Sequence, residues 1–295
     1  MLRRPIGPIL AVALVVIGAA CAGSPSSSSD DAGDAGGTDP VHRGPQGSVA
    51  QFIVQCELSH LAFDDPIVFP DEPGASHLHQ FFGNAAVDSD PDYDRVSGAE
   101  TSCRQAKDTA SYWAPALLDV EGRQVEARGM TAYYRPGRGV DPADVVAYPP
   151  GLMLVAGDMH ATEPQSTEIV AWSCGTGASR EVRPPTCPPS STLRMIVRFP
   201  DCWDGTSMSS LAHDPTAAYS VDGCPDDQPI AVPQLTLAID YPPVAADGLR
   251  LASGDIITGH ADFWNVWDQR QLEEEVLLCI NRDLVCGVSD VGSSR

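Results

Sequence analysis

The stretch IAVPQLTLAIDYP, residues 230–242, carries the pattern that decides the fold class. Apolar residues alternate along it and prolines interrupt it, which is typical of short β-strands with one buried face. The same pattern predicts short strands at residues 50–58, 65–70, 125–134, 151–158, 167–174, 192–200 and 248–257. Twenty-six prolines and 26 glycines supply the turns between these strands.

One segment, residues 267–283, has a helical pattern instead. Leu272, Val276, Cys279 and Ile280 recur there at helical spacing and share one face. No internal repeat and no regular alternation of strands with helices is visible. The sequence therefore predicts a mainly β protein, an antiparallel β-sandwich with long loops and one C-terminal helix.

The first twenty residues have the features of an export signal. Arg3 and Arg4 precede an apolar run, residues 9–20, which is too short to form a stable membrane span. Cys21 follows small residues as in a bacterial lipobox, although Gly18 stands where leucine is usual. We therefore predict a signal peptide over residues 1–20 and lipid modification of Cys21. Such a lipoprotein would be extracytoplasmic and membrane-anchored, and the alternative is ordinary cleavage and secretion.

Composition divides the rest of the chain into three parts. Residues 21–47 are rich in Ser, Gly and Asp and are expected to form a disordered tether. Residues 48–288 are expected to fold as a single β-rich domain, followed by a disordered tail over residues 289–295. The net charge of −22 argues against nucleic acid and suits cations or neutral ligands such as polysaccharide. An organism with an acidic proteome would give the same charge.

Nine cysteines are present, and eight remain when Cys21 is set aside. An even number in an exported chain favours four disulfides, although eight cysteines allow on the order of a hundred pairings. Loop closure favours near neighbours, which gives Cys174–Cys187, Cys202–Cys224 and Cys279–Cys286 and leaves Cys56–Cys103. A zinc–thiolate cluster is disfavoured because the sequence has no CxxC pair.

The segment GASHLHQFFGN, residues 74–84, brings two of the seven histidines together. On a strand, His77 and His79 would project from one face, with Leu78 and Gln80 on the other. Such a pair chelates a divalent transition metal ion, copper included, if a third ligand joins it. The candidates for that ligand are His213, His260, Asp262 and Asp108. The alternative is a polar network without metal, in which the histidines bond a backbone carbonyl and a carboxylate.

Catalysis on glycans without a metal is a second hypothesis. Sandwich-type lyases and hydrolases use histidine or tyrosine to abstract a proton and a carboxylic acid to protonate the leaving oxygen. The candidate catalytic residues are His77, His79, Asp108, Tyr112, His260 and Asp262. Asp65 and Asp204 are better explained as turn residues. A third hypothesis is a glycan-binding protein without catalysis, although most aromatic side chains are expected to fill the core.

Several phrases together resemble a known family. The longest are DPIVFPDEPGASHLHQFFGN (65–84), TSCRQAKDTASYWAPAL (101–117), CPPSSTLRMIVRFPDCWDG (187–205) and GHADFWNVWD (259–268). In order and spacing they resemble the secreted domain of unknown function 1996, found in fungi and actinobacteria and sometimes fused to carbohydrate-binding modules. The resemblance spans about residues 52–288. It implies that the candidate histidines and carboxylates belong to a shared pattern, and it implies no activity.

The chain departs from that family pattern at two positions. Thr216 and Gln228 stand where histidine is common, which puts part of any histidine site in doubt. No GxSxG elbow, HExxH motif or phosphate-binding loop is present, so a serine-triad hydrolase is unsupported. The sequence thus predicts an exported cell-envelope lipoprotein that acts on or binds polysaccharide through a histidine-rich polar cleft. The alternative is a non-catalytic glycan-binding or metal-binding protein.

Overall fold

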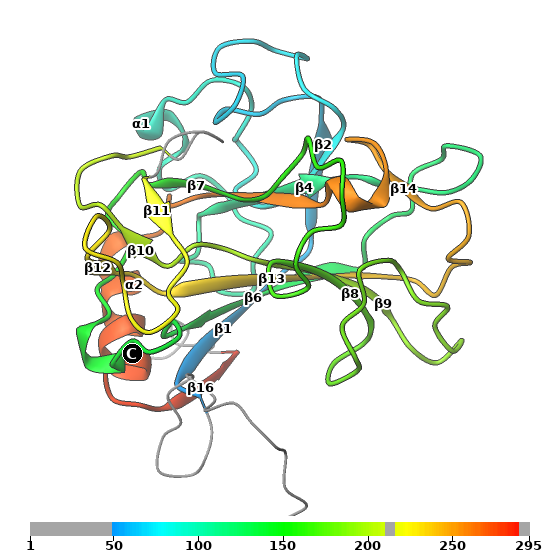
Figure 1. The fold of residues 1–295 in the computed structure, drawn as a ribbon. Coiled ribbons are helices and arrows are strands. Elements are labelled where there is room, and N and C mark those ends of the chain that lie inside the picture. The colour runs from blue at the N-terminus through cyan, green and yellow to red at the C-terminus, as the bar shows by residue number, and fades with distance from the viewer. Residues whose placement is uncertain (1–48, 210–215, 289–295) are drawn as a thin grey trace, which may run out of the picture. The chain divides into compact units, whose positions relative to one another are not determined.

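Two β-sheets, of six and five strands, form the framework of the protein (Figure 1). The structure is a computed structural model and describes residues 49–209 and 216–288. The six-stranded sheet has the order β16-β1-β6-β13-β9-β8. Its strands are β1 (Gln51–Cys56), β6 (Gly129–Arg135), β8 (Val170–Cys174), β9 (Leu193–Arg198), β13 (Gln234–Tyr241) and β16 (Val285–Val288). All neighbours in it are antiparallel except β1 and β16, which are parallel.

The five-stranded sheet has the order β2-β3-β4-β15-β7 and is antiparallel throughout. Its strands are β2 (Leu58–Ala62), β3 (His79–Gly83), β4 (Ser111–Pro115), β7 (Met153–Gly157) and β15 (His260–Trp264). Because β3 and β15 both pair with β4, they run in the same direction. Residues at the starts of β3 and β15 therefore meet at the same end of this sheet.

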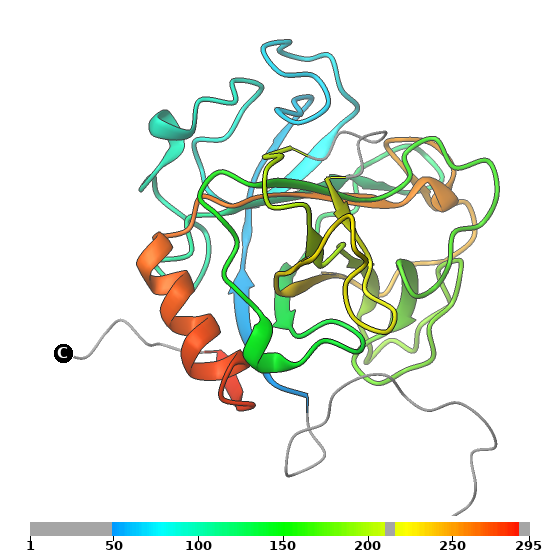
Figure 2. The ribbon, with the colours of Figure 1, turned by 60° about the vertical axis from the view of Figure 1, so that its left-hand side comes forward.

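Short elements complete the described structure. Two small sheets contain β10 (Cys202–Trp203), β11 (Ala217–Ala218), β12 (Ile230–Ala231), β5 (Leu117–Leu118) and β14 (Arg250–Leu251). The helices are α1 (Tyr93–Val96) and α2 (Gln269–Glu275). Three further short helical elements are η1 (Pro142–Asp144), η2 (Ile256–Thr258) and η3 (Val276–Ile280). Helix α2 continues directly into η3, and Figure 2 shows this C-terminal helical segment alongside β1. Within the described residues, no helix has the length and apolar character needed to cross a membrane.

The two sheets pack face to face through one apolar core. Leu235 and Leu237 of β13 lie in this core with Tyr112 of β4 and Phe263 of β15. Thr236, which lies between Leu235 and Leu237 in β13, faces outward, because successive side chains of a strand point to opposite faces. This arrangement confirms the mainly β, antiparallel sandwich predicted from the sequence, with its one C-terminal helix.

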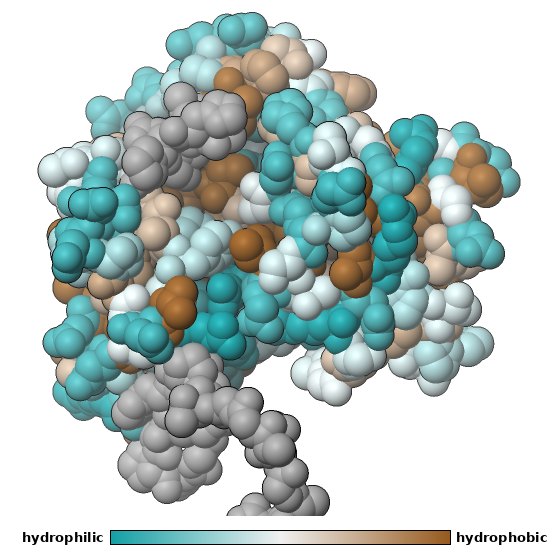
Figure 3. All heavy atoms as spheres, in the orientation of Figure 1, coloured by the Kyte–Doolittle hydropathy of each residue, from teal (hydrophilic) through white to brown (hydrophobic). Residues whose placement is uncertain are grey.

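A second, smaller apolar cluster lies on the outer face of the five-stranded sheet. Phe81 of β3 and Trp113 of β4 contact Ile67, Val87 and Val96 there. Ile67 precedes β3, and Val87 and Val96 follow it, within the segment that leads from β2 through β3 to β4. This segment covers part of a face that would otherwise contact solvent. Polar side chains on the same face are buried as a result. Figure 3 shows one face of the molecule, on which hydrophilic side chains are interspersed with smaller apolar areas.

Four disulfides join the predicted pairs, Cys56–Cys103, Cys174–Cys187, Cys202–Cys224 and Cys279–Cys286. Most predicted strands are present, but residues 65–70 form turns rather than a strand. The cause is Asp65, whose Oδ1 accepts hydrogen bonds from the backbone N–H groups of Ile67 and Val68, both at 3.0 Å. Residues 248–257 form only the short strand β14 and the start of η2.

Candidate metal centre

Three histidines meet on the outer face of the five-stranded sheet. His79 is the first residue of β3 and His260 is the first residue of β15, so the parallel course of these strands brings them together. His77 lies two residues before His79. The ring centroids are 4.2 Å apart for His77 and His79, 5.0 Å for His77 and His260, and 5.8 Å for His79 and His260. One nitrogen from each ring lies within 4.8 Å of the other two.

Backbone carbonyls fix the orientation of two of these rings. Nδ1 of His79 donates to the carbonyl oxygen of Asp64 at 2.9 Å, and Nδ1 of His260 donates to that of Thr258 at 2.8 Å. A carbonyl oxygen only accepts, so the proton of each neutral ring is on Nδ1 and the lone pair is on Nε2. Metal-binding histidines are held in this way, with one nitrogen bonded to a backbone carbonyl or carboxylate and the other directed at the ion.

Five buried side-chain atoms of the three histidines and the adjoining Asp262 have no hydrogen-bond partner among the described residues. They are Nε2 of His77, His79 and His260 and both carboxylate oxygens of Asp262. Asp262 and His79 are fully buried, and His77 is the ligand candidate nearest the surface. A buried polar atom without a partner costs about 1–3 kcal/mol, so five such atoms on neighbouring side chains point to a ligand that the chain itself does not supply.

Burial keeps the three imidazoles neutral. Desolvation lowers the pKa of His77 to about 3, and the neighbouring His260 and His160 add to the shift. Desolvation also lowers the pKa of His260 to about 4, against the hydrogen bond to Thr258, and holds the pKa of His79 well below its usual value. Neutral imidazole is the form that binds a metal ion, so the site does not have to lose protons from its histidines first.

Two aspartates adjoin the histidines. Asp65, His79 and Asp262 form a second group whose ligand atoms lie within 4.8 Å of one another. Burial raises the pKa of Asp65 to about 6, and burial together with the charge of Asp65 raises the pKa of Asp262 well above its usual value. An uncompensated carboxylate is costly in this setting, and a bound cation would supply the missing charge.

Sequence reasoning missed two members of this neighbourhood. Asp65 is correctly predicted as a turn residue, but its place beside His79 has no local signal because it precedes His79 by fourteen residues in the chain. His160 lies exposed in the loop after β7, close enough to influence His77 and His260 electrostatically. Gln165 ties this loop to the start of β15, because its side-chain NH₂ donates to the carbonyl oxygens of Ile257 and Gly259.

The other predicted site residues lie apart from the histidines. Asp108 and Tyr112 are fully buried, with Tyr112 in the core between the sheets, while the histidines occupy the outer face. Tyr112 donates to Oδ2 of Asp108 at 2.8 Å and is hydrogen-bonded to the hydroxyl of Tyr134. The structure therefore does not bring Asp108 and Tyr112 into one cleft with the histidines. His213 and Cys21 fall outside the described residues.

One of the two departures from the family pattern, Thr216, also lies elsewhere. Thr216 is buried and donates to the carbonyl oxygen of Ser209, which forms a bridge with Met153 at the start of β7. His260 pairs with Gly157 at the other end of β7, four residues and roughly 13 Å away. Replacement of a histidine by Thr216 thus leaves the three-histidine cluster intact. A third group of potential ligands, Cys56, Cys103 and Asp108, is explained by the disulfide between its cysteines.

Asp108 gives a pH-dependent stability that an Asp108→Asn variant should lose. Burial raises the pKa of Asp108 from 3.8 to about 8, so the folded state keeps a proton that the unfolded chain loses at lower pH. The free energy of unfolding should therefore fall as pH rises towards 8, by up to about 1.4 kcal/mol per pH unit. Urea denaturation from pH 6.5 to 8.5, where unfolded histidines are mostly neutral, measures this slope in both proteins. Parallel slopes would contradict the assignment.

The fold and the site together define an extracytoplasmic β-sandwich protein with a buried histidine centre, since four disulfides indicate an oxidising environment. The chain belongs to the family described as domain of unknown function (DUF1996), which matches residues 65–267. The predicted family is thereby confirmed. A comparison with curated proteins found no match. A comparison with solved structures found none either.

Proposed function

We propose that this domain binds a divalent transition metal ion outside the cytoplasm. The ligands are Nε2 of His77, His79 and His260, with Asp262 as the adjoining carboxylate. The observation that carries the proposal is the convergence of three histidines that each have a buried, unpartnered Nε2, two of them on rings oriented through Nδ1. A polar network without metal would instead give these nitrogens partners, and none exists among the described residues.

The donor set favours zinc or copper. Imidazole nitrogens suit zinc, copper, iron and nickel, whereas calcium and magnesium require oxygen ligands. Zinc-bound imidazole nitrogens lie about 2.1 Å from the ion and hence about 3.4 Å from each other in a tetrahedral site. The three nitrogens lie within 4.8 Å of one another, so small side-chain movements suffice to close the site. Copper should bind more tightly than zinc, in line with the general order of divalent affinities.

Metal titration of the mature protein tests the proposal. After treatment with a chelator, calorimetry with Zn²⁺ and Cu²⁺ should give one ion per chain, and His79→Ala and His260→Ala should each weaken binding by about 100-fold or more. His60→Ala is the matched control. The ring of His60 also lies against Phe81, but its Nε2 donates to the carbonyl oxygen of Val87 at 3.0 Å and it is not part of the cluster. Binding that survives in both cluster variants would refute the proposed ligand set.

The finer predictions from the sequence extend this proposal. Lipid attachment at Cys21 would hold the metal-binding domain at the outer surface of a membrane. Polysaccharide remains a proposed partner, and the metal centre would be the place at which the domain acts on it. The position of Asp108 and Tyr112 leaves the histidines and Asp262 as the groups available for such chemistry. Glycan turnover that is lost with the metal and restored by its return is the expected result for this role.

A further inference from the structure

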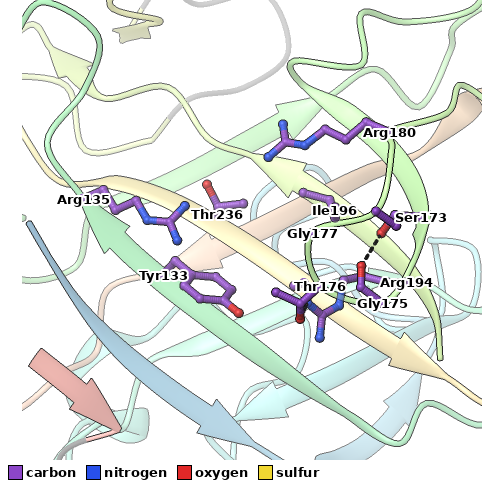
Figure 4. Close-up of a pocket in the computed structure, with 12 residues that line it drawn as sticks. Tyr133, Arg135, Ser173, Gly175, Thr176, Gly177, Arg180, Arg194, Ile196 and Thr236 are labelled. Atoms are coloured by element: carbon purple, nitrogen blue, oxygen red, sulfur yellow. Dashed lines mark hydrogen bonds between the residues drawn. The ribbon is translucent and has the colours of Figure 1, made fainter. Parts of the chain in front are cut away.

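A pocket of about 220 Å³ lies on the outer face of the six-stranded sheet, on different strands from the histidine cluster (Figure 4). Outward-facing side chains of four neighbouring strands form its floor, among them Tyr133, Arg135, Arg194 and Thr236. The turn that follows β8, residues 175–178, forms a wall together with Arg180. Three arginines and no carboxylate thus line a single pocket in a chain with 40 acidic and 18 basic residues.

Two of these arginines keep their charge available. Arg194 is neutralised, because its Nε and one terminal nitrogen donate to the two carboxylate oxygens of Asp240, both at 2.7 Å. Arg135 has only a neutral hydrogen-bond partner among the described residues, Oε1 of Gln51 at 2.7 Å, and its guanidinium lies 4.6 Å from the ring centre of Tyr133. No ion pair involves Arg135 or Arg180 in the part of the chain that the structure describes.

The two available arginines act on the same space. Figure 4 shows the guanidinium groups of Arg135 and Arg180 extending over the floor from opposite sides, near Thr236. They are close enough for the charge of Arg180 to lower the pKa of Arg135, in addition to the larger effect of burial. Two like charges held together over a pocket without a counter-charge are repulsive, and an anion between them removes that repulsion.

The wall of the pocket is held in place before any ligand arrives. The hydroxyl of Ser173 donates to the carbonyl oxygen of Gly175 at 3.1 Å, and Arg194 donates to the hydroxyl of Thr176 at 2.8 Å. The disulfide Cys174–Cys187 closes the loop that contains this turn. Little ordering is therefore required on binding, which favours affinity.

We propose that this pocket binds an oxyanion group, a carboxylate or phosphate, between Arg135 and Arg180. Guanidinium groups match the paired oxygens of both anions, and the hydroxyls of Tyr133, Thr176 and Thr236 provide further hydrogen bonds to a polar, hydroxylated ligand. The proposal does not depend on metal at the histidine cluster.

Calorimetric titration of the mature protein at low salt, with galacturonate, inorganic phosphate and galactose, tests this site. The two anions should bind saturably and neutral galactose should not. Arg180→Gln should weaken anion binding by about tenfold or more, as loss of a charge-assisted hydrogen bond implies, and Arg135→Gln should do the same. Arg180 is exposed, so its replacement should leave the fold intact even if removal of the more buried Arg135 disturbs it. Arg250→Gln, an exposed arginine on β14, is the control.

The relative affinities identify the source of the anion. Tighter binding of galacturonate than of phosphate assigns the site to organic acids such as acidic sugars, and equal or tighter binding of phosphate assigns it to the free oxyanion. Either result supports the proposal. It is overturned if neither anion binds saturably, if galactose binds as well as galacturonate, or if both Arg135→Gln and Arg180→Gln bind the anions as the unchanged protein does.

Discussion

Replacement of Gly83 by alanine is expected to lower the free energy of unfolding by about 3 kcal/mol or more. Gly83 ends β3 with a φ of +83°, a conformation that alanine adopts only with strain. A Cβ atom at this position would also lie 2.2 Å from the carbonyl oxygen of Ala110, on the backbone that leads into β4. Because both obstacles are in the backbone, a change of side-chain rotamer does not relieve them.

Gly98→Ala separates the two causes. Gly98 has a similar φ of +71°, but a Cβ atom there would meet nothing within 4 Å. Its replacement should cost only about 1 kcal/mol, the backbone term alone. Denaturant unfolding of both variants with disulfides intact gives the comparison. Equal losses of stability in the two variants would show that the close approach of β3 to Ala110 contributes nothing.

Removal of the disulfide Cys56–Cys103 is expected to have a similar effect on stability and a second effect on metal binding. The cysteines are 47 residues apart, and for a closed loop of that length chain entropy predicts a loss of about 4 kcal/mol. The loop contains Asp65, His77 and His79, whereas His260 and Asp262 lie outside it. A double Cys→Ser variant should therefore also bind Zn²⁺ at least about tenfold more weakly, because half of the ligand set loses its tether.

The disulfide Cys279–Cys286 provides the matched control. Its cysteines are only seven residues apart, so the same relation predicts a loss of about 2.5 kcal/mol. It joins the end of the helical segment η3 to β16 and encloses no residue of the histidine cluster. Unfolding by denaturant and zinc titration, measured on both double variants, should show weakened metal binding only without Cys56–Cys103. Equal zinc affinities would contradict the link between this loop and the metal centre.

The sequence predicted the six-stranded sheet better than the five-stranded one. Strands such as β1 have one face in the core and one partly exposed, so they show the alternation on which the prediction depended. Strands β3, β4 and β15 are buried on both faces along their whole length. In segments such as HQFFG and HADFW, apolar and polar residues therefore do not alternate, so these strands were not predicted. Only the spacing of their histidines indicated that they are of interest.

The candidate site was predictable in part. The spacing of His77 with His79 and of His260 with Asp262 depends on strand geometry alone, and the structure brings these residues together. The structure separates Asp108 and Tyr112 from them, because register decides which face of a sheet a residue occupies and one residue of shift reverses it. Local sequence does not determine that register. The proximity of Asp65 to His79 depends on the course of a long loop over the sheet, which no short sequence motif predicts.

The disulfide Cys56–Cys103 has a consequence for when and where the proposed metal ion would be bound. In a reducing cytoplasm the bond does not persist, and the segment that carries His77 and His79 is then free to separate from His260. The proposed centre would reach its full affinity only after export and oxidation, so the chain would bind its ion most tightly outside the cytoplasm. Which metal it carries would then depend mainly on the supply outside the cytoplasm.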